Sequence, residues 1–459
     1  MTPLRQRWLA ALCLAVLVAP AATAAAPEKP AATPETKAEP FRPEMGKFPP
    51  LEKAYAYRGQ LVFVDAPNRR GSLRVEATGR FNNNPPHPFA MLPFGIIQYH
   101  GAPADLRDIP LGTMLHVRAF LPPDPRISPV PVLPLDCTTK KKFFAEAAGI
   151  EPAENHVLLL EDEPSHCRRE GKVWKLGELE IKNNAGTIVT SRVPKDGGAA
   201  AATDAKASQE TIQEAIQETM NFDAATRIWR GRECLSVKDL IAEGVWPAEG
   251  KKPLGGQTVF LGIAWKPKVV GEIEVGNVFT RFHISDIWLD DAALDRAADS
   301  QTETHRAFIR SRWMPAWVDA VEYGEFGKAT VIATLFGGMD PSLYAAFKKG
   351  TTAMMNGAEY TLKHAGSAYG PAHMAAHGRI LDVTQPSGDV PLGSSGIQIR
   401  FQTDAITEGL RTGRVVRILP ADWPKGVLPR EEFVGDGAIY SREDRFPNPN
   451  IFPKYELGQ

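Results

Sequence analysis

A strand–turn–strand pattern that occurs twice places the tightest constraint on the fold of this 459-residue chain. Val64-Asp65-Ala66 is followed by a turn and the segment GSLRVEAT, and Trp317-Val318-Asp319-Ala320 is followed by a turn and the segment GKATVIATLF. Both patterns read as an apolar strand, Asp-Ala, a turn, Gly and a second strand. The two aspartates would most simply lie at strand ends and cap the turns. The recurrence suggests an internal duplication.

Short apolar or alternating runs continue along the chain, separated by residues that favour turns. The runs from Phe94 to Tyr99, Met114 to Leu121, Leu176 to Ile181 and Ile397 to Phe401 are examples. Such spacing is typical of small barrels and sandwiches. The sequence therefore predicts a mainly β fold with small helices, built as two or three small barrel- or sandwich-like modules.

Shifts in composition suggest where the modules begin and end. We expect a signal peptide at 1–26, a Pro-rich tether at 27–50, a first β domain at 51–194, a Gly/Ala linker at 195–207, an α+β middle segment at 208–304, a second β domain at 305–425 and an irregular C-terminal tail at 426–459.

The N-terminal segment has the three parts of a secretory signal. Arg5 and Arg7 precede the apolar run from Leu9 to Val18, and small residues follow at Ala22-Thr23-Ala24 and Ala24-Ala25-Ala26. No later segment approaches the roughly 20 apolar residues that a membrane helix needs. We therefore expect an exported protein, either periplasmic or extracellular.

The charge of the chain limits the kinds of partner that it can bind. The chain has 53 Lys and Arg against 54 Asp and Glu, without a basic stripe, which argues against nucleic acid as a partner.

An export compartment permits disulfides, and Cys137 with Cys167 would be the pair, leaving Cys234. The alternative is that all three are unpaired.

The loop from His100 to His116 is the first candidate site. It holds two histidines, two aspartates and an arginine between strands: His100, Asp105, Arg107, Asp108 and His116. Loops on rigid β scaffolds often carry binding groups. The alternative is a solvated turn with an internal ion pair.

Three histidines of the second β domain form a candidate metal site. One helical turn from Pro371 to Gly378 would place His373 and His377 on the same face, and His364 would complete the set. Asp382 or the Met354-Met355 pair could also complete it, and thioether ligands would favour copper over zinc. The alternative is a surface pair of histidines.

Several enzyme signatures are missing from the sequence. There is no His-Glu-x-x-His, Gly-x-Ser-x-Gly, Walker loop, dinucleotide fingerprint or Cys-x-x-Cys. The sequence therefore favours an exported, non-enzymatic protein without a confident cofactor, which binds a small ligand or a component of the cell envelope. A periplasmic copper- or zinc-binding protein or a metallohydrolase is the alternative, and a purely structural envelope component is a third interpretation.

Overall fold

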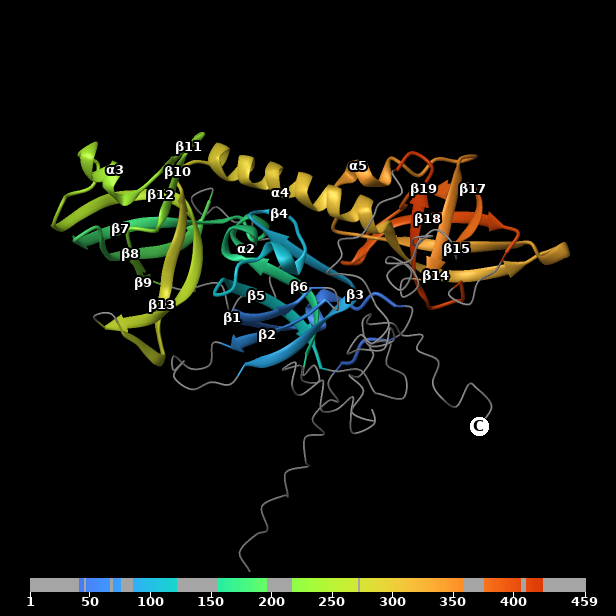
Figure 1. The fold of residues 1–459 in the computed structure, drawn as a ribbon, viewed down its shortest axis with the longest axis horizontal. Helices are drawn as coiled ribbons and strands as arrows, with labels where there is room; N and C mark the ends of the chain where they lie inside the picture. The colour runs from blue at the N-terminus through green and yellow to red at the C-terminus, as the bar shows by residue number, and fades with distance from the viewer. Residues whose placement is uncertain are drawn as a thin grey trace, which may run out of the picture. The chain divides into compact units, whose positions relative to one another are not determined.

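The computed structural model describes residues 41–44, 47–66, 69–75, 86–121, 155–195, 217–270, 273–357, 375–405 and 410–423. All of them belong to one compact unit, Phe41–Gln459. The fold is mainly β, as the sequence predicts, with three sheets and short helices (Figure 1). None of the helices in these ranges is both long enough and apolar enough to cross a membrane.

The first sheet closes into a small barrel. Its strands are β1 (Tyr55–Asp65), β2 (Arg70–Val75), β3 (His87–Tyr99), β4 (Ala102–Pro103), β5 (Met114–Phe120) and β6 (Asn155–Asp162). They follow the order β2-β1-β5-β6-β3-β4, and a further pairing of β2 with β3 closes a ring of five strands. Strand β3 is buried along most of its length, which fits its almost continuous apolar sequence.

The second sheet has seven strands. They are β7 (Lys172–Lys182), β8 (Ala185–Pro194), β9 (Gln217–Phe222), β10 (Arg227–Arg230), β11 (Glu233–Leu235), β12 (Gly250–Val270) and β13 (Ile273–Trp288), in the order β11-β10-β13-β12-β7-β8-β9. In β7, Leu179 and Ile181 point into the core while Glu178 and Glu180 stay exposed, as strict alternation predicts.

The third sheet is a closed six-stranded barrel in which every pairing is antiparallel. Its strands are β14 (Met314–Tyr323), β15 (Ala329–Phe336), β16 (Thr352–Gly357), β17 (Ala376–Thr384), β18 (Ser394–Thr403) and β19 (Val415–Pro420). Alternate residues of β15 and β18 fill its interior, among them Val331, Leu335, Ile399 and Phe401.

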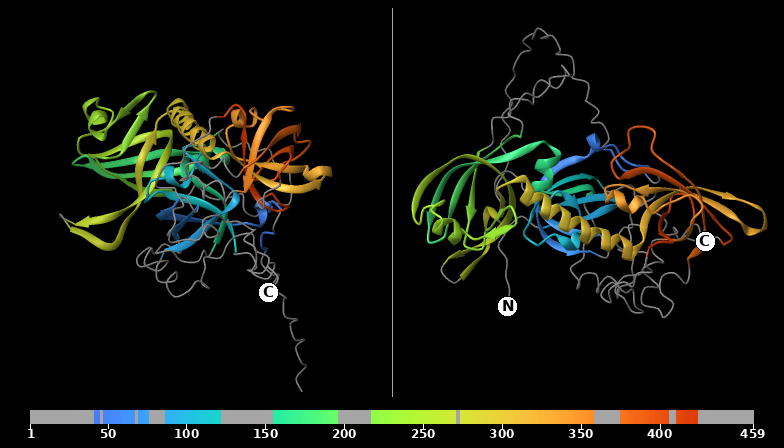
Figure 2. Two further views of the ribbon diagram at one scale, coloured as in Figure 1. Left: turned by 45° about the vertical axis from the view of Figure 1, so that its right-hand side comes forward. Right: turned by 90° about the horizontal axis from the view of Figure 1, so that it is seen from above.

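Short helices precede or follow the strands. They are η1 (Leu51–Lys53), η2 (Leu106–Asp108), α2 (Glu163–Arg169), α3 (Val237–Ala242), η3 (Glu325–Gly327) and α5 (Pro341–Tyr344). Helix α2 connects the first sheet to the second. The longest helix, α4 (Asp291–Arg312), joins the seven-stranded sheet to the six-stranded barrel (Figure 2). Ion pairs of Asp291 with Lys195 and of Arg306 with Asp340 attach its two halves to these neighbours.

Both expected hairpins are present, and each supplies the first two strands of a barrel. Asp65 ends β1 opposite Arg70, next to the turn. Asp319 differs from the expectation, because β14 continues past it to Tyr323. It lies at a bulge within the strand, where it accepts hydrogen bonds from Thr334 Oγ1 at 2.8 Å and Gln398 Nε2 at 3.1 Å.

The domain boundaries that the three sheets define differ from those that the composition of the sequence suggested. Strands β7 and β8 lie within 51–194, which we expected to form one domain, but they pair with β9 and β12 of the second sheet. His305, where the second β domain was expected to begin, lies inside α4. Phe41 and Phe48, within the expected tether, pack 5.5 Å from Phe120 and 4.8 Å from Phe94, between ring centroids.

The first and last barrels share an aromatic cluster. Phe94 of β3 has its ring centroid 6.2 Å from that of Trp317 and 6.1 Å from that of Phe336, both in near-perpendicular contact. Trp317 and Phe336 are almost fully buried. Such pairs add to the stabilisation that apolar burial provides, so this cluster holds β3 firmly against β14 and β15.

Candidate binding pocket beside helix α4

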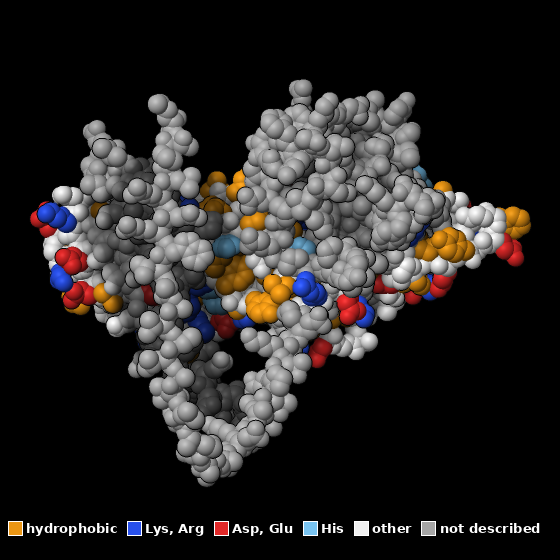
Figure 3. All heavy atoms as spheres, turned by 90° about the horizontal axis from the view of Figure 1, so that it is seen from below, with side chains coloured by type: hydrophobic (Ala, Val, Ile, Leu, Met, Phe, Trp, Pro, Cys, Tyr) orange, Lys and Arg blue, Asp and Glu red, His pale blue; other side chains and the backbone are white. Residues whose placement is uncertain are grey.

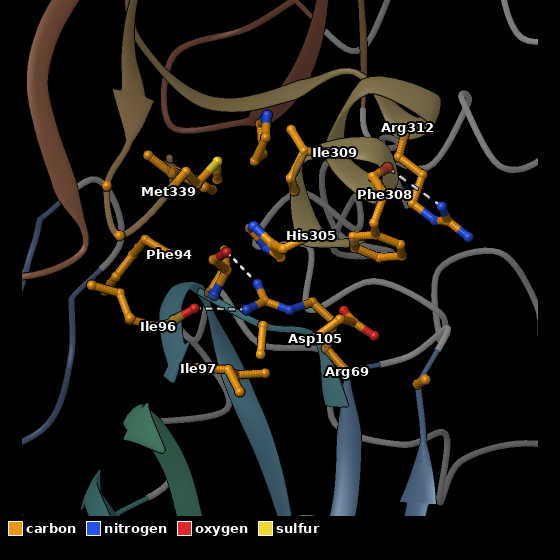
Figure 4. A pocket seen from close by; sticks show the side chains of 18 of the residues that line it. Arg69, Phe94, Ile96, Ile97, Asp105, His305, Phe308, Ile309, Arg312 and Met339 are labelled. Carbon is orange, nitrogen blue, oxygen red and sulfur yellow. Dashed lines mark hydrogen bonds between the residues drawn. The ribbon is translucent and has the colours of Figure 1, made fainter. Parts of the chain in front are cut away.

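A pocket lies where the first barrel, the C-terminal half of α4 and the six-stranded barrel meet (Figure 4). It has about 1000 Å³ of empty space, part of which is open to solvent. Its apolar walls come from β3, α4, the end of β15 and the start of β19: Phe94, Ile96, Ile97, Phe308, Ile309, Phe336, Met339 and Val415.

Arg69 enters the pocket from the turn between β1 and β2. Its Nη1 donates to the carbonyl of Pro93 at 2.5 Å, and its Nη2 donates to the carbonyl of Gly95 at 2.7 Å (Figure 4). The pairing of β3 with β6 shifts register between Met91 and Ile96, so the regular ladder is interrupted here. Arg69 therefore supplies donors to the interrupted strand and also brings a fixed positive charge to the pocket.

Two further guanidinium groups lie over the ring of Phe308. The Cζ atom of Arg312 is 3.9 Å from the ring centroid, and that of Arg107 is 4.5 Å away. Both distances are within the range of a cation–π interaction. Arg312 Nη1 also donates to Ser311 Oγ at 2.6 Å, which restrains the guanidinium at the end of the helix.

The lining carries an excess of positive charge. Arg417 joins the three arginines already described, and its Nη1 donates to the carbonyl of Arg312 at 3.1 Å. Asp105 is the one carboxylate among the described lining residues, and it is paired with Arg107 at 3.0 Å. Since charges act strongly in a partly desolvated site, this lining favours an anion.

His305 is the polar side chain at the apolar wall. It is 6% exposed, and its Nδ1 has no hydrogen-bond partner in the part of the chain that the structure describes. Burial lowers its pKa to about 4, so the imidazole is neutral near pH 7. A buried polar atom without a partner destabilises the protein, and a ligand with a complementary polar atom would relieve that cost.

The five candidate site residues of the loop from His100 to His116 lie in different parts of the structure. Asp105 and Arg107 line the pocket. Asp108 lies beside them, because its Oδ2 accepts from Asp105 N at 2.8 Å and from Gln301 Nε2 at 2.9 Å. These contacts cap η2 and attach it to α4.

The two histidines of that loop lie elsewhere. His100 has φ +56° and stacks on Tyr99 with 3.8 Å between ring centroids, near Trp288. His116 Nε2 is 2.6 Å from Glu163 Oε2, on the outer face of the first barrel. The five residues therefore do not converge on one ligand.

Only one of the three expected metal ligands, His377, is among the residues that the structure describes. His377 lies in β17, exposed and directly opposite Met354 of β16, where a helical turn was expected. His364 and His373 lie outside the described residues. Within the described ranges there is no group of three or more His, Cys, Asp or Glu side chains that could hold a metal.

Of the two cysteines expected to pair, Cys137 lies outside the described residues. Cys167 is a buried free thiol, and its Sγ donates to Glu163 Oε1 at 3.3 Å. Burial raises the pKa of this thiol well above its usual value, so it is not a reactive thiolate. Cys234 is exposed.

Sequence reasoning missed several of the residues that make the pocket. His305, Phe308 and Arg312 are spaced by three and four residues, which places them on one face of α4. This spacing can be read from the sequence. The three residues combine a neutral base, an aromatic ring and a cation on one helix face, so they could have identified the helix as a candidate site. Arg69 and Arg417 had no such signal.

Comparisons with known proteins add no family: no family model, no curated protein and no solved structure matches this chain.

Proposed function

We propose that this chain is a non-enzymatic binding protein whose pocket beside α4 takes a small organic anion, a carboxylate or phosphate attached to an apolar body. The observation that carries the proposal is the combination of four arginines, one carboxylate and a neutral His305 in a cavity with apolar walls, where His305 Nδ1 has no hydrogen-bond partner among the described residues. Binding sites of this kind are mostly apolar and use a few fixed polar groups for orientation.

Different residues of the pocket lining would contact different parts of such a ligand. The arginine end, with Arg312 and Arg417, suits the anionic group. His305 offers one hydrogen bond, since a neutral imidazole has one donor and one acceptor nitrogen. The side chains of Phe94, Ile96 and Met339 would contact the apolar body.

A fluorescent probe tests this proposal directly. We would titrate the full chain with 8-anilinonaphthalene-1-sulfonate, an aromatic body that carries one sulfonate, and then displace it with dodecanoate or with uncharged dodecanol. The proposal expects saturable fluorescence that dodecanoate reverses at about tenfold lower concentration than dodecanol, a difference of roughly 1.4 kcal/mol.

Two substitutions on the same helix locate the binding. Arg312→Gln removes a charge from the pocket, whereas Arg310→Gln removes one from an exposed position two residues away. We expect about tenfold weaker dodecanoate binding in the first, a loss of roughly 1.4 kcal/mol, and no change in the second. Equal displacement by the acid and the alcohol, or equal loss in both variants, would contradict the proposal. Circular dichroism confirms that both variants fold.

We also propose that the protein is exported. The support is the signal-like pattern of residues 1–26, with cleavage after Ala24 or Ala26. Mass spectrometry of the protein recovered from the producing cell's exterior or periplasm should find an N-terminus at Ala25 or Pro27. Recovery of an intact Met1 from the cytoplasm alone would contradict export.

A further inference from the structure

A second depression lies on the outer face of the first barrel, and it shares no lining residue with the pocket beside α4. It crosses β1, β5 and β6 and reaches α2, with about 730 Å³ of empty space, part of it open to solvent. Its ionisable lining includes three arginines, two histidines and one glutamate: Arg58, Arg118, Arg169, His116, His166 and Glu161.

Strand register brings the central side chains together. His116 of β5 is the direct partner of Arg58 on β1 and of Glu161 on β6. Direct partners on neighbouring strands project to the same face with their Cβ atoms about 5 Å apart. From α2, His166 stacks on His116 with 3.7 Å between centroids and 6° between the ring planes. The depression is therefore built by regular structure and not by a loop.

The buried carboxylate of Glu163 determines which nitrogen of His116 carries the proton. Glu163 is 1% exposed and also accepts from Arg192 Nη2 at 2.5 Å and Trp174 Nε1 at 3.0 Å. Burial alone would raise its pKa, but the hydrogen bond from His116 and the positive charge of Arg192 hold the pKa well below its usual value. Because Glu163 is ionised, His116 must donate from Nε2, which is 2.6 Å away.

His116 therefore offers a hydrogen-bond acceptor at Nδ1. Burial lowers the pKa of His116 to about 4, so the ring is neutral near pH 7 and Nδ1 keeps its lone pair. This nitrogen has no hydrogen-bond partner among the described residues and is not one of their fully buried polar atoms. A ligand in the depression can reach it.

The three arginines of the depression are hydrogen-bond donors, and Glu161 is an acceptor. Arg118 forms no ion pair within the part of the chain that the structure describes. Arg169 Nε donates to both oxygens of Glu161, at 2.8 and 3.0 Å, and Arg58 pairs with Glu218 at 3.4 Å. The depression thus combines guanidinium donors, which match the oxygens of an oxyanion, with acceptors at His116 and Glu161.

This mixture discriminates between oxyanions. Sulfate has only acceptor oxygens near neutral pH, so its oxygens would face the lone pair of His116 and the carboxylate of Glu161 without a hydrogen bond. A phosphate or phosphomonoester in its monoprotonated form brings one P–O–H donor, and its other oxygens accept from the arginines. The second pKa of a phosphomonoester is about 6, so the ester carries one proton in mildly acidic solution, and inorganic phosphate carries at least one P–O–H group there.

We propose that this depression is a binding site for inorganic phosphate or for a phosphomonoester, in a form that carries at least one P–O–H group, and that it selects against sulfate. Arg118 provides the uncommitted positive charge, and His116, oriented by Glu163, accepts the proton of the ligand. The site is independent of the function proposed for the pocket beside α4.

The test is a titration of the full chain with inorganic phosphate, O-phosphoserine and sulfate at constant ionic strength and mildly acidic pH. Binding is followed through the imidazole signals of His116 and His166 by long-range ¹H–¹⁵N correlation. We expect saturable shifts with both phosphates and at least tenfold weaker response to sulfate. Equal binding of sulfate and phosphate would overturn the selectivity, and no saturable shift with phosphate would overturn the site.

Substitutions place the ligand. Arg118→Gln should weaken phosphate binding at least tenfold, and Arg118→Lys should restore part of it. Arg232→Gln, at an exposed position in the turn between β10 and β11, should change nothing. Thermal melting of each variant separates loss of binding from loss of fold. Full phosphate affinity in a folded Arg118→Gln variant would overturn the placement.

Discussion

Gly338 lies so close to Ile96 that a Cβ built on the glycine would be 2.7 Å from Cγ1 and 2.8 Å from Cδ1 of the isoleucine. The glycine follows β15 and has φ +75°, and the isoleucine belongs to β3. The first and last barrels therefore approach each other through a position without a side chain. This approach lies beside the cluster of Phe94, Trp317 and Phe336.

Gly338→Ala should destabilise the protein by about 2–4 kcal/mol. The left-handed backbone disfavours alanine by roughly 1 kcal/mol, and the added methyl overpacks the contact at a cost of about 1–3 kcal/mol. Urea unfolding followed by tryptophan fluorescence measures the change. Gly350→Ala is the matched control, because Gly350 also has a left-handed backbone, with φ +84°, and a Cβ there meets nothing within 4 Å. Equal effects of the two substitutions would contradict the tight contact.

Glu163→Gln should cost about 3–5 kcal/mol of unfolding free energy, since it leaves Arg192, whose side chain is only 16% exposed, without its charged partner. Glu178→Gln is the comparison, because Glu178 pairs with Lys251 on the surface and both side chains are more than half exposed. Exposed pairs contribute about 0–1 kcal/mol. Denaturant unfolding of both variants measures the difference, and a small loss at Glu163 would show that the buried network is not maintained by charge.

Stability should fall as the pH is lowered from about 6.5 towards 4. Burial lowers the pKa values of His100, His116, His283 and His305 to about 4 and that of His156 to about 3, from an ordinary value of 6.5. In this window the unfolded chain binds protons that the folded protein excludes, so acid favours unfolding. We expect a loss on the order of 1–2 kcal/mol per histidine at pH 5.

Asp162 opposes this trend. Burial raises its pKa from 3.8 to about 7, so the folded protein holds a proton that the unfolded chain releases between these values. Its contribution to stability therefore decreases as the pH rises through that window and does not change further at higher pH. Five histidines outweigh one aspartate, and urea unfolding at pH 7.5, 6 and 5 should show the net acid destabilisation. A flat profile would contradict the neutral, buried state of the histidines.

His305→Leu should separate binding from stability. Leucine removes the unpartnered Nδ1, so the ligand-free protein should be at least as stable as the parent, by up to about 1 kcal/mol. Dodecanoate binding in the pocket beside α4 should weaken at the same time. Thermal melting and probe displacement measure the two effects. A large loss of stability would mean that the imidazole is a structural group and not a ligand contact.

Phe326→Asn should stabilise the chain by about 0.5–1 kcal/mol. Phe326 has φ +57° at the β14–β15 turn and is 95% exposed, so asparagine relieves a left-handed conformation and loses no packing. Exposed hydrophobic side chains gather at the end of this hairpin (Figure 3). Tyr323→Asn is the control, because Tyr323 is in β14, where asparagine is disfavoured, and thermal melting should shift in the opposite direction.

Local patterns predicted the strands well, because alternation reports which face of a strand is buried. Leu179 in β7 and Ile399 in β18 show this directly. Pairing between strands was harder, since nothing in the sequence of β7 says that its neighbour is β12 and not a strand of the first barrel. The alternation would be the same in either sheet.

The candidate pocket was the least predictable part. Asp105 and Arg107 drew attention because they are close in sequence, and they line the pocket. Arg69, His305 and Arg417 meet there from positions more than 100 residues apart. Their convergence depends on how the sheets pack, and local periodicity carries no information about that.

Helix α4 has 22 residues and is therefore about 33 Å long. Asp295 near its start pairs with Arg168, Gln301 at its middle bonds to Asp108, and Arg306 pairs with Asp340. The three partners lie in different elements, Arg168 in α2, Asp108 in η2 and Asp340 at the start of α5, so they hold the helix at three points along its length. Amide protons along α4 should accordingly exchange with solvent as one cooperative group, and a ligand held by its last turns should slow exchange in its first.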